Sequence, residues 1–290
     1  MICNQELMNT AASECPEQMD VIKVPILFDD KASIEYAGST DAALTTWIQN
    51  AIHAATKLTR GFPYPMAFEL EDQNEEPKFE TSTIGVTRYA GEGAKGFLVH
   101  AIQDMQQLPK LAAANGLTVQ VFLVDQKKQV WGLKSTNGYV PVEMMATSYN
   151  GAHRTADSAK MMTKYDYVNP EDYNNLRMLG TLTSSLSSLK GLADVTLENV
   201  GTASAPKIKL FIDGTDVTSR YATTLLAKEA WLVKGAAPAS NVTYDATTVA
   251  FTTFTTVTTA GDVIRLVDPA ALHALTVPVN NIEGTPLTLA

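Results

Sequence analysis

The chain lacks most of the residues that metal sites and disulfide-stabilised folds require. Only two cysteines occur among 290 residues, which excludes a disulfide framework and a cysteine-rich zinc site. Four scattered histidines leave little for a histidine-based metal site. No stretch approaches the ~20 apolar residues of a membrane span. With 45% apolar and 18% charged residues, the composition is that of a core-forming globular chain of one large or two ordinary domains.

Basic residues are also scarce. Lys and Arg number 22 against 31 Asp and Glu, giving a net charge of −9. A free-standing reader of duplex DNA is excluded, because such proteins need a basic face to displace counterions. Residues 1–80 carry 14 acids and 5 bases, whereas the remaining residues are balanced. The acidic run from Glu69 to Glu80 is either a solvated loop or a surface that faces an anion without binding it.

The first residues contain no targeting signal. Met1–Glu17 has no Lys or Arg and no apolar run, so a secretory signal is not expected. We therefore expect a protein that is made and kept in a cytoplasm, with Cys3 and Cys15 as reduced thiols. Their spacing leaves a Cys3–Cys15 bridge as the alternative.

One amphipathic helix is predicted over residues 41–60. Leu44, Trp47, Ile48 and the apolar positions that follow through Ala55 form one stripe at helical spacing. Thr40 or Asp41 can cap its start, and Gly61 with Pro63 ends it. His53 lies beside the stripe and is expected to be a packed or surface residue rather than a ligand.

Strand patterns dominate the middle of the chain. An apolar β segment over 21–28 comes before the predicted helix. From about 79 to 167, a short helix is expected near 108–114, and Asp125 with Lys127 and Lys128 marks a hairpin turn between two strands. Together with the helix, these strands predict an α+β, mainly β sandwich over residues 1–180. The predicted strands of this region are 79–86, 117–125, 129–134, 139–149 and 160–168.

Residues 169–190 are interpreted as a connection to a second β domain. The Ser- and Thr-rich stretch 181–191 is typical of a linker. Turn signals separate five further strand candidates, which predict a C-terminal immunoglobulin-like sandwich over residues 190–290. These candidates are 194–200, 207–212, 229–235, 248–258 and 262–267.

No stretch matches a catalytic motif that withstands inspection. Gly91–Gly96 matches a glycine-rich fingerprint, but its preceding strand is half polar, and Glu92 would repel a pyrophosphate. Asp213–Asp216 resembles half a calcium loop but lacks the later bidentate Glu, so a hairpin turn is the better interpretation. The carboxylate pairs have no His or Cys at catalytic spacing. We therefore expect no enzymatic activity, no cofactor and no metal.

The order of these features resembles the major tail tube proteins of tailed bacteriophages. The early cysteines, the VIKVPILF segment (21–28), the FETSTIGV segment (79–86), the short helix and VFLVDQKKQVWGLK (121–134) with Asn137-Gly138 carry the resemblance over residues 1–167. The chain departs from the pattern at Asp125-Gln-Lys-Lys, where an Asp-x-Asn-Gly turn is usual, and in the length of the 41–60 helix.

The resemblance implies an α+β sandwich that forms stacked hexameric rings around an acidic channel. DNA would pass through without specific binding, and other virion proteins would be partners. The N-terminal arm (Met1–Asp20) is one candidate contact, and the C-terminal domain resembles immunoglobulin-like modules of virion proteins. The protein would reside in a virion assembled in the host cytoplasm, with no membrane partner. The candidate inter-ring contact residues are Glu71, Asp72, Glu75, Glu76, Gly91, Gly93 and Gly96.

Three alternatives stay open at this point. A head or connector protein would form a shell or a ring of different symmetry. A surface carbohydrate-binding module would use Trp231 and Tyr244, although no signal peptide is seen. A cryptic enzyme would bind a nucleotide at Gly91–Gly96.

Overall fold

The computed structural model describes residues 19–102, 107–150, 160–254 and 258–290. The chain is mainly β and forms several sheets. It divides into two compact units: the first contains residues 1–49 and 61–189, and the second contains residues 50–60 and 190–290. The predicted Cys3, Cys15 and most of the predicted N-terminal arm lie outside the described residues.

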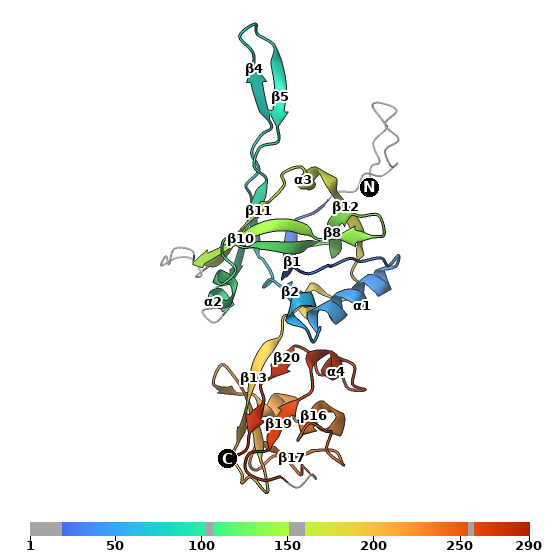
Figure 1. Cartoon of the computed structure of the whole chain (residues 1–290), viewed down its shortest axis with the longest axis vertical. Coiled ribbons are helices and arrows are strands. Elements are labelled where there is room, and N and C mark those ends of the chain that lie inside the picture. The colour runs from blue at the N-terminus through green and yellow to red at the C-terminus, as the bar shows by residue number, and fades with distance from the viewer. Residues whose placement is uncertain (1–18, 103–106, 151–159, 255–257) are drawn as a thin grey trace. The chain divides into compact units, whose positions relative to one another are not determined.

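The first unit contains one large sheet and a separate two-stranded hairpin (Figure 1). Along its main path the sheet has the strand order β12-β8-β7-β10-β11-β6-β3. Its elements are β1 (Ile22–Asp29), α1 (Asp41–Ile52, whose last residues belong to the second unit), β2 (Phe62–Pro63), β3 (Glu69–Asp72), β4 (Lys78–Thr81), β5 (Thr87–Gly91), β6 (Gly96–Ile102), α2 (Gln107–Ala112), β7 (Thr118–Asp125), β8 (Gln129–Lys134), β9 (Tyr139–Val140), β10 (Val142–Asn150), β11 (Lys160–Tyr167), α3 (Asp172–Asn175) and β12 (Leu176–Thr181).

Strand β7 lies at the centre of this unit. It pairs with β1 along one edge and with both β8 and β10 along the other. Val121 and Leu123 point into the main hydrophobic core, whereas Phe122 packs edge-on against Trp47 of α1, with ring centroids 5.7 Å apart. Because both faces of β7 are covered, its sequence is a nearly continuous apolar run rather than a strict alternation.

Helix α1 confirms the predicted stripe but is shorter than predicted. Leu44, Ile48 and Ile52 are buried, and Trp47 packs against the core. The helix ends at Ile52, eight residues before the predicted end. Arg60 explains the difference, because its guanidinium turns back and donates to the carbonyls of Ala54 and Ala55, which holds that segment in a non-helical turn.

Three other expectations are corrected in this unit. The stretch predicted as one strand over 79–86 is a hairpin, because its turn lies inside that stretch, with Gly85 at φ +82°. Residues 169–190 are not merely a connection, since β12 pairs with β8. The predicted strand over 139–149 is broken at Pro141 into β9 and β10, as expected for a residue without an N–H.

The second unit consists of two small sheets around one hydrophobic core. One sheet has the order β17-β18-β14-β13-β20, and the other has the order β16-β19-β21. Its elements are β13 (Ala193–Asn199), β14 (Ile208–Ile212), β15 (Thr215–Asp216), β16 (Trp231–Val233), β17 (Thr243–Asp245), β18 (Ala250–Thr252), β19 (Val263–Leu266), α4 (Pro269–His273), β20 (Ile282–Gly284) and β21 (Leu287–Thr288).

Trp231 forms the centre of this second core. Its side chain is fully buried, its ring packs on Phe251 and Phe254, and its indole N–H donates to the carbonyl of Leu225 at 2.8 Å. The predicted strand over 248–258 is much shorter in the structure, as β18 ends at Thr252, Thr253 has a positive φ, and residues 255–257 lie outside the description.

Candidate functional site

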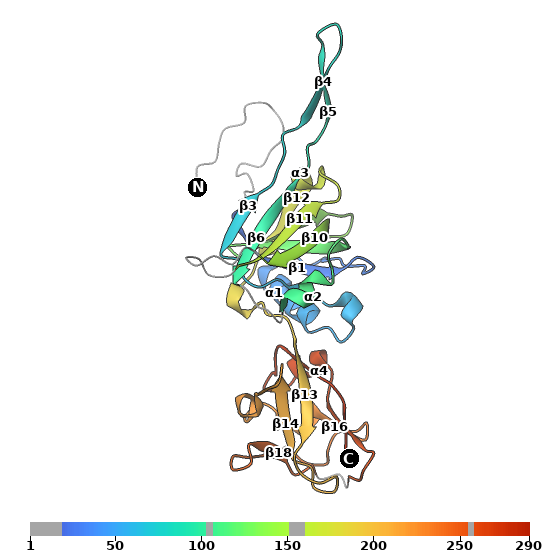
Figure 2. The ribbon, with the colours of Figure 1, turned by 90° about the vertical axis from the view of Figure 1, so that its left-hand side faces the viewer.

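A long hairpin extends from the edge of the first unit's sheet. Strands β3 and β6 pair at the sheet edge, and the chain between them continues outward as β4 and β5 (Figures 1 and 2). We call residues 76–91 the arm, and residues 72–75 with 92–96 the root. Every residue from 76 to 90 is exposed to solvent, so the arm contributes nothing to the core of its own unit.

The arm nevertheless has a regular internal structure. Phe79 lies opposite Tyr89, and their rings meet edge to face with centroids 6.1 Å apart. The hydroxyls of Thr81 and Thr87 lie 3.0 Å apart across the next pair on the same face. At the tip, Gly85 adopts a left-handed conformation that favours glycine.

The arm presents large apolar side chains to solvent. Ile84 at the tip is 84% exposed, and Phe79 is 63% exposed. Tyr89 and Val86 are also exposed. An isolated two-stranded hairpin is only marginally stable in water, and single chains seldom gather exposed apolar groups in this way. The arm therefore has the features of a segment that packs against another surface.

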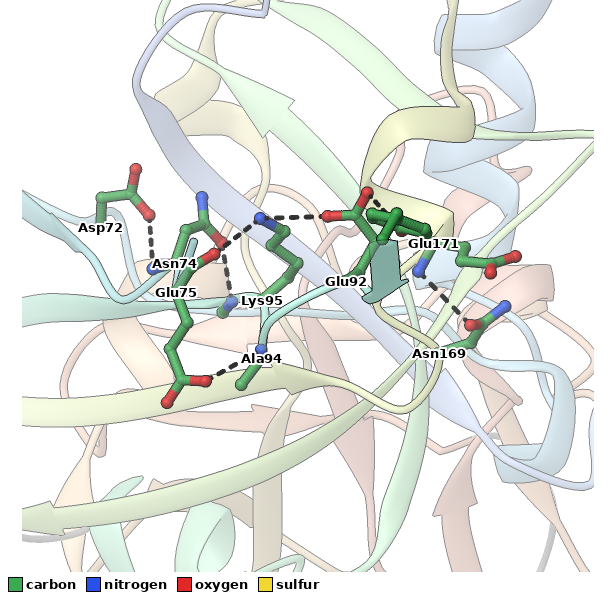
Figure 3. Close-up of polar contacts among 10 residues, drawn as sticks. Asp72, Asn74, Glu75, Glu92, Ala94, Lys95, Asn169 and Glu171 are labelled. Atoms are coloured by element: carbon green, nitrogen blue, oxygen red, sulfur yellow. Dashed lines mark hydrogen bonds and ion pairs between the residues drawn. The ribbon is translucent and has the colours of Figure 1, made fainter. Parts of the chain in front are cut away.

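The root is held by a network of hydrogen bonds (Figure 3). Glu75 donates its N–H to the carbonyl of Ala94 at 2.8 Å, and its carboxylate accepts from the N–H of Ala94 at 3.2 Å. The ammonium of Lys95 donates to the carbonyl of Glu75 and lies 3.5 Å from the Glu92 carboxylate. The side chain of Asn74 accepts from the N–H of Gly96 at 3.0 Å. These bonds fix the direction in which the arm leaves the sheet.

Two glycines allow the strands of the root to approach closely. A Cβ on Gly93 would collide with the backbone of Glu75 and Glu76. A Cβ on Gly96 would come within 2.6 Å of the carbonyl oxygen of Tyr165. The segment 91–96 was expected to be a flexible hairpin loop, but it is the return strand of the root. It does not join a strand to a helix, so it lacks the geometry of a dinucleotide fingerprint.

A buried histidine lies below the root. His100 on β6 is almost fully buried, and its two ring nitrogens lie 3.5 Å from Glu69 and 3.0 Å from Glu71 of β3. Both approaches are out of line for good hydrogen bonds. Lys160 donates to Glu69 at 3.0 Å, and this bond lowers the pKa of the Glu69 carboxyl. The charged groups fix β3, the edge strand from which the arm begins.

The structure gathers the candidate contact residues at one place. Glu71 and Asp72 lie on β3, and the others lie in the arm or its root. Several of their polar groups already have partners within the chain, such as Asp72, which accepts from the N–H of Asn74. Sequence reasoning missed the exposed apolar residues of the arm, although Gly85 in a Thr-Ile-Gly-Val stretch is a turn signal.

The candidate hairpin turn is confirmed as a turn between β7 and β8. Lys128 has φ +66° and donates its N–H to the carbonyl of Asp125. Lys127 donates its N–H to the buried Asp125 carboxylate and forms an ion pair with Asp20 at 3.0 Å. Hydrogen bonds from Gln126 and Lys127 lower the pKa of Asp20 to about 2.

The other proposed sites do not form in the described part of the chain. Trp231 is fully buried and Tyr244 packs on Phe251, so neither forms an open platform for a sugar. Asp213 and Gly214 have positive φ values in the β14–β15 turn, and Asp216 is occupied by Thr218 and Lys209. Within the described ranges, no cluster of three metal-ligating side chains occurs.

Membrane and family comparisons give no further assignment. None of the helices among the described residues is long and apolar enough to cross a membrane. Comparison with protein-family models, curated proteins and solved structures gave no match.

Proposed function

We propose that this chain is a structural subunit of a tailed-phage virion, and most specifically a tail tube subunit without enzymatic activity. The first unit would be the tube-like sandwich, and the second an immunoglobulin-like module. The single observation that carries the proposal is the exposed apolar arm held by an ordered root. The sequence resemblance over residues 1–167 selects the tail tube among assembling proteins.

The energetic argument starts from the apolar side chains of the arm. Covering a fully exposed Ile or Phe side chain contributes about 1.5–3 kcal/mol. The arm carries four large exposed side chains, and its anchored root reduces the conformational entropy lost on docking. An arm of this kind is therefore a favourable contact for a neighbouring subunit and an unfavourable surface for a monomer.

The proposed partner is a second copy of this chain. An arm that docks on a different surface of its neighbour makes a heterologous contact, and repeated heterologous contacts build stacks or filaments. The net charge of −9 in the first 80 residues supports a conduit that anionic DNA passes without adhering. Glu71, Glu75 and Glu76 would then lie at or near the contact between rings.

The test is negative-stain electron microscopy of the full chain, with light scattering over a range of concentrations. The expected result is six-fold rings or tubes with a central channel. Ile84→Asp places a charge at the exposed tip, where it cannot disturb the core. Losing one apolar contact of this size should raise the concentration needed for assembly about tenfold or more.

The matched control is Val200→Asp, because Val200 is also exposed but lies outside the arm. This variant should assemble like the wild-type protein. Shells or rings of another symmetry would assign the chain to the head or connector instead. A wild-type monomer under all conditions, or normal assembly of Ile84→Asp, would refute the role of the arm.

A further inference from the structure

Residues 50–60 belong to the second unit although they lie far from it in sequence. The chain therefore passes between the units after residues 49, 60 and 189. Within the second unit, Ile52 and His53 are buried to 1% exposure or less. The segment is attached at two points, one through Arg60 and one through His53.

The first attachment is a permanent ion pair. Arg60 is 3% exposed, and two of its nitrogens lie 2.7 Å and 3.3 Å from the carboxylate oxygens of Glu283 on β20. The same guanidinium donates to the carbonyls of Ala54 and Ala55. A guanidinium stays protonated at every physiological pH, so this attachment has no proton to gain in mild acid.

The second attachment consists of two stacked imidazoles. The rings of His53 and His273 lie parallel within 5°, with centroids 4.2 Å apart. The backbone N–H of Asn281 points at Nε2 of His53, at 3.3 Å. A backbone amide can only donate, so Nε2 must carry a lone pair rather than a proton. The Nδ1 of His273 faces the side-chain oxygen of Asn280 at 2.6 Å and is the donor in that contact.

We propose that the His53–His273 stack is a pH-sensitive latch that holds residues 50–60 in the second unit. Protonation of His53 at Nε2 removes the acceptor for the Asn281 amide. Protonation of both rings places two positive charges one ring spacing apart. Both changes oppose the closed arrangement, whereas the open segment accepts the protons freely.

The surrounding charges do not offset this repulsion. On the segment itself, Arg60 adds a third positive charge. On β20, Glu283 is already engaged by Arg60. Asp268, the other charged group of the α4 region, caps the start of that helix by accepting from the N–H of Ala271. Lys190 contributes its carbonyl, which accepts from the Asn281 side chain.

The sign of the pH dependence follows from proton counts. The closed state favours the neutral rings, so the open state binds more protons below the ordinary histidine range near pH 6.5. The latch is therefore closed at neutral pH and opens in mild acid. Once it opens, only the crossing at Leu189–Lys190 joins residues 190–290 to the first unit. The inference does not depend on the proposed assembly.

Hydrogen exchange of the full chain tests the latch at about pH 7.5 and about pH 5.5, on either side of the ordinary histidine pKa. After correction for intrinsic exchange rates, amides 53–60 should exchange about tenfold faster at the lower pH, the equivalent of one unit of pKa difference. Amides of β14, in the core of the same unit, serve as the internal reference.

His273→Phe is the decisive variant, because it keeps a flat ring over His53 but cannot gain a charge. Its exchange at 53–60 should lose most of the pH dependence. Circular dichroism verifies its folding, and His273→Gln replaces it if Phe is not accommodated. Equal exchange of wild-type amides 53–60 at both pH values, or full pH dependence in the folded uncharged variant, would overturn the proposal.

Discussion

Replacing Asp125 by Asn tests whether a buried carboxylate holds the β7–β8 turn. The Asp125 side chain is fully buried. One oxygen accepts from the backbone N–H groups of Lys127 and Gln129, both at 2.9 Å. The other accepts from the indole of Trp131 at 3.1 Å and from the N–H of Asp20 at 3.2 Å. The carboxylate thus accepts four hydrogen bonds and donates none.

The expected loss follows from these four bonds. An Asn side chain keeps one acceptor oxygen, and its NH₂ group can only donate toward the indole and the Asp20 amide. Each bond to a charged acceptor contributes about 1.5–3 kcal/mol. The Trp131 indole has no access to water and bears the full loss, whereas the half-buried Asp20 recovers part of it from solvent. Asp125→Asn should therefore lower the free energy of unfolding by about 2–4 kcal/mol.

Urea unfolding followed by tryptophan fluorescence and circular dichroism measures this loss in the transition of the first unit. Asp213→Asn is the matched control, because Asp213 also occupies a hairpin turn but is exposed, and Asn tolerates its positive φ of 49°. The control should change stability by no more than about 0.5 kcal/mol. A loss below about 1 kcal/mol for Asp125→Asn would refute this account of the turn.

Two further predictions concern the core of the first unit. A Cβ on Gly132 would lie 2.7 Å from both the Phe122 ring and the Val140 carbonyl, so Gly132→Ala should cost about 1–3 kcal/mol in thermal melts, while Gly191→Ala, which meets nothing within 4 Å, should cost about 1 kcal/mol or less. Burial raises the pKa of Tyr64 to about 12; stability should therefore be full below about pH 10 and fall as the pH rises toward 12, by an amount that Tyr64→Phe removes, and an unchanged alkaline profile of this variant would contradict the assignment.

Local signals predicted the parts of the fold that depend on neighbouring residues. The turn at Asp125 and Lys128 and the apolar stripe through Leu44 and Ile48 follow from short-range sequence patterns, and the structure contains both. The end of α1 could not be predicted in this way, because it depends on Arg60, whose ion-pair partner Glu283 is 223 residues away.

Non-local pairing explains the elements that were missed. The strand β12 has no distinctive alternation, and it becomes a strand because it pairs with β8. The strands β20 and β21 are equally short, and each depends on a distant partner strand. The Thr-rich stretch that predicted one long strand forms only β18, because β-branched residues favour a pleated surface only where a neighbouring strand provides one.

The candidate site shows a related separation between polarity and contact. Glu75 and Gly93 were selected because polar, glycine-rich segments often lie at interfaces. In the structure they serve the root, where an unsupported hairpin needs directional bonds and close backbone approach. The surface available to a partner lies farther out, on apolar residues such as Phe79 and Ile84. A variant at the root should therefore change the direction and order of the arm, whereas a variant at the tip should change affinity alone.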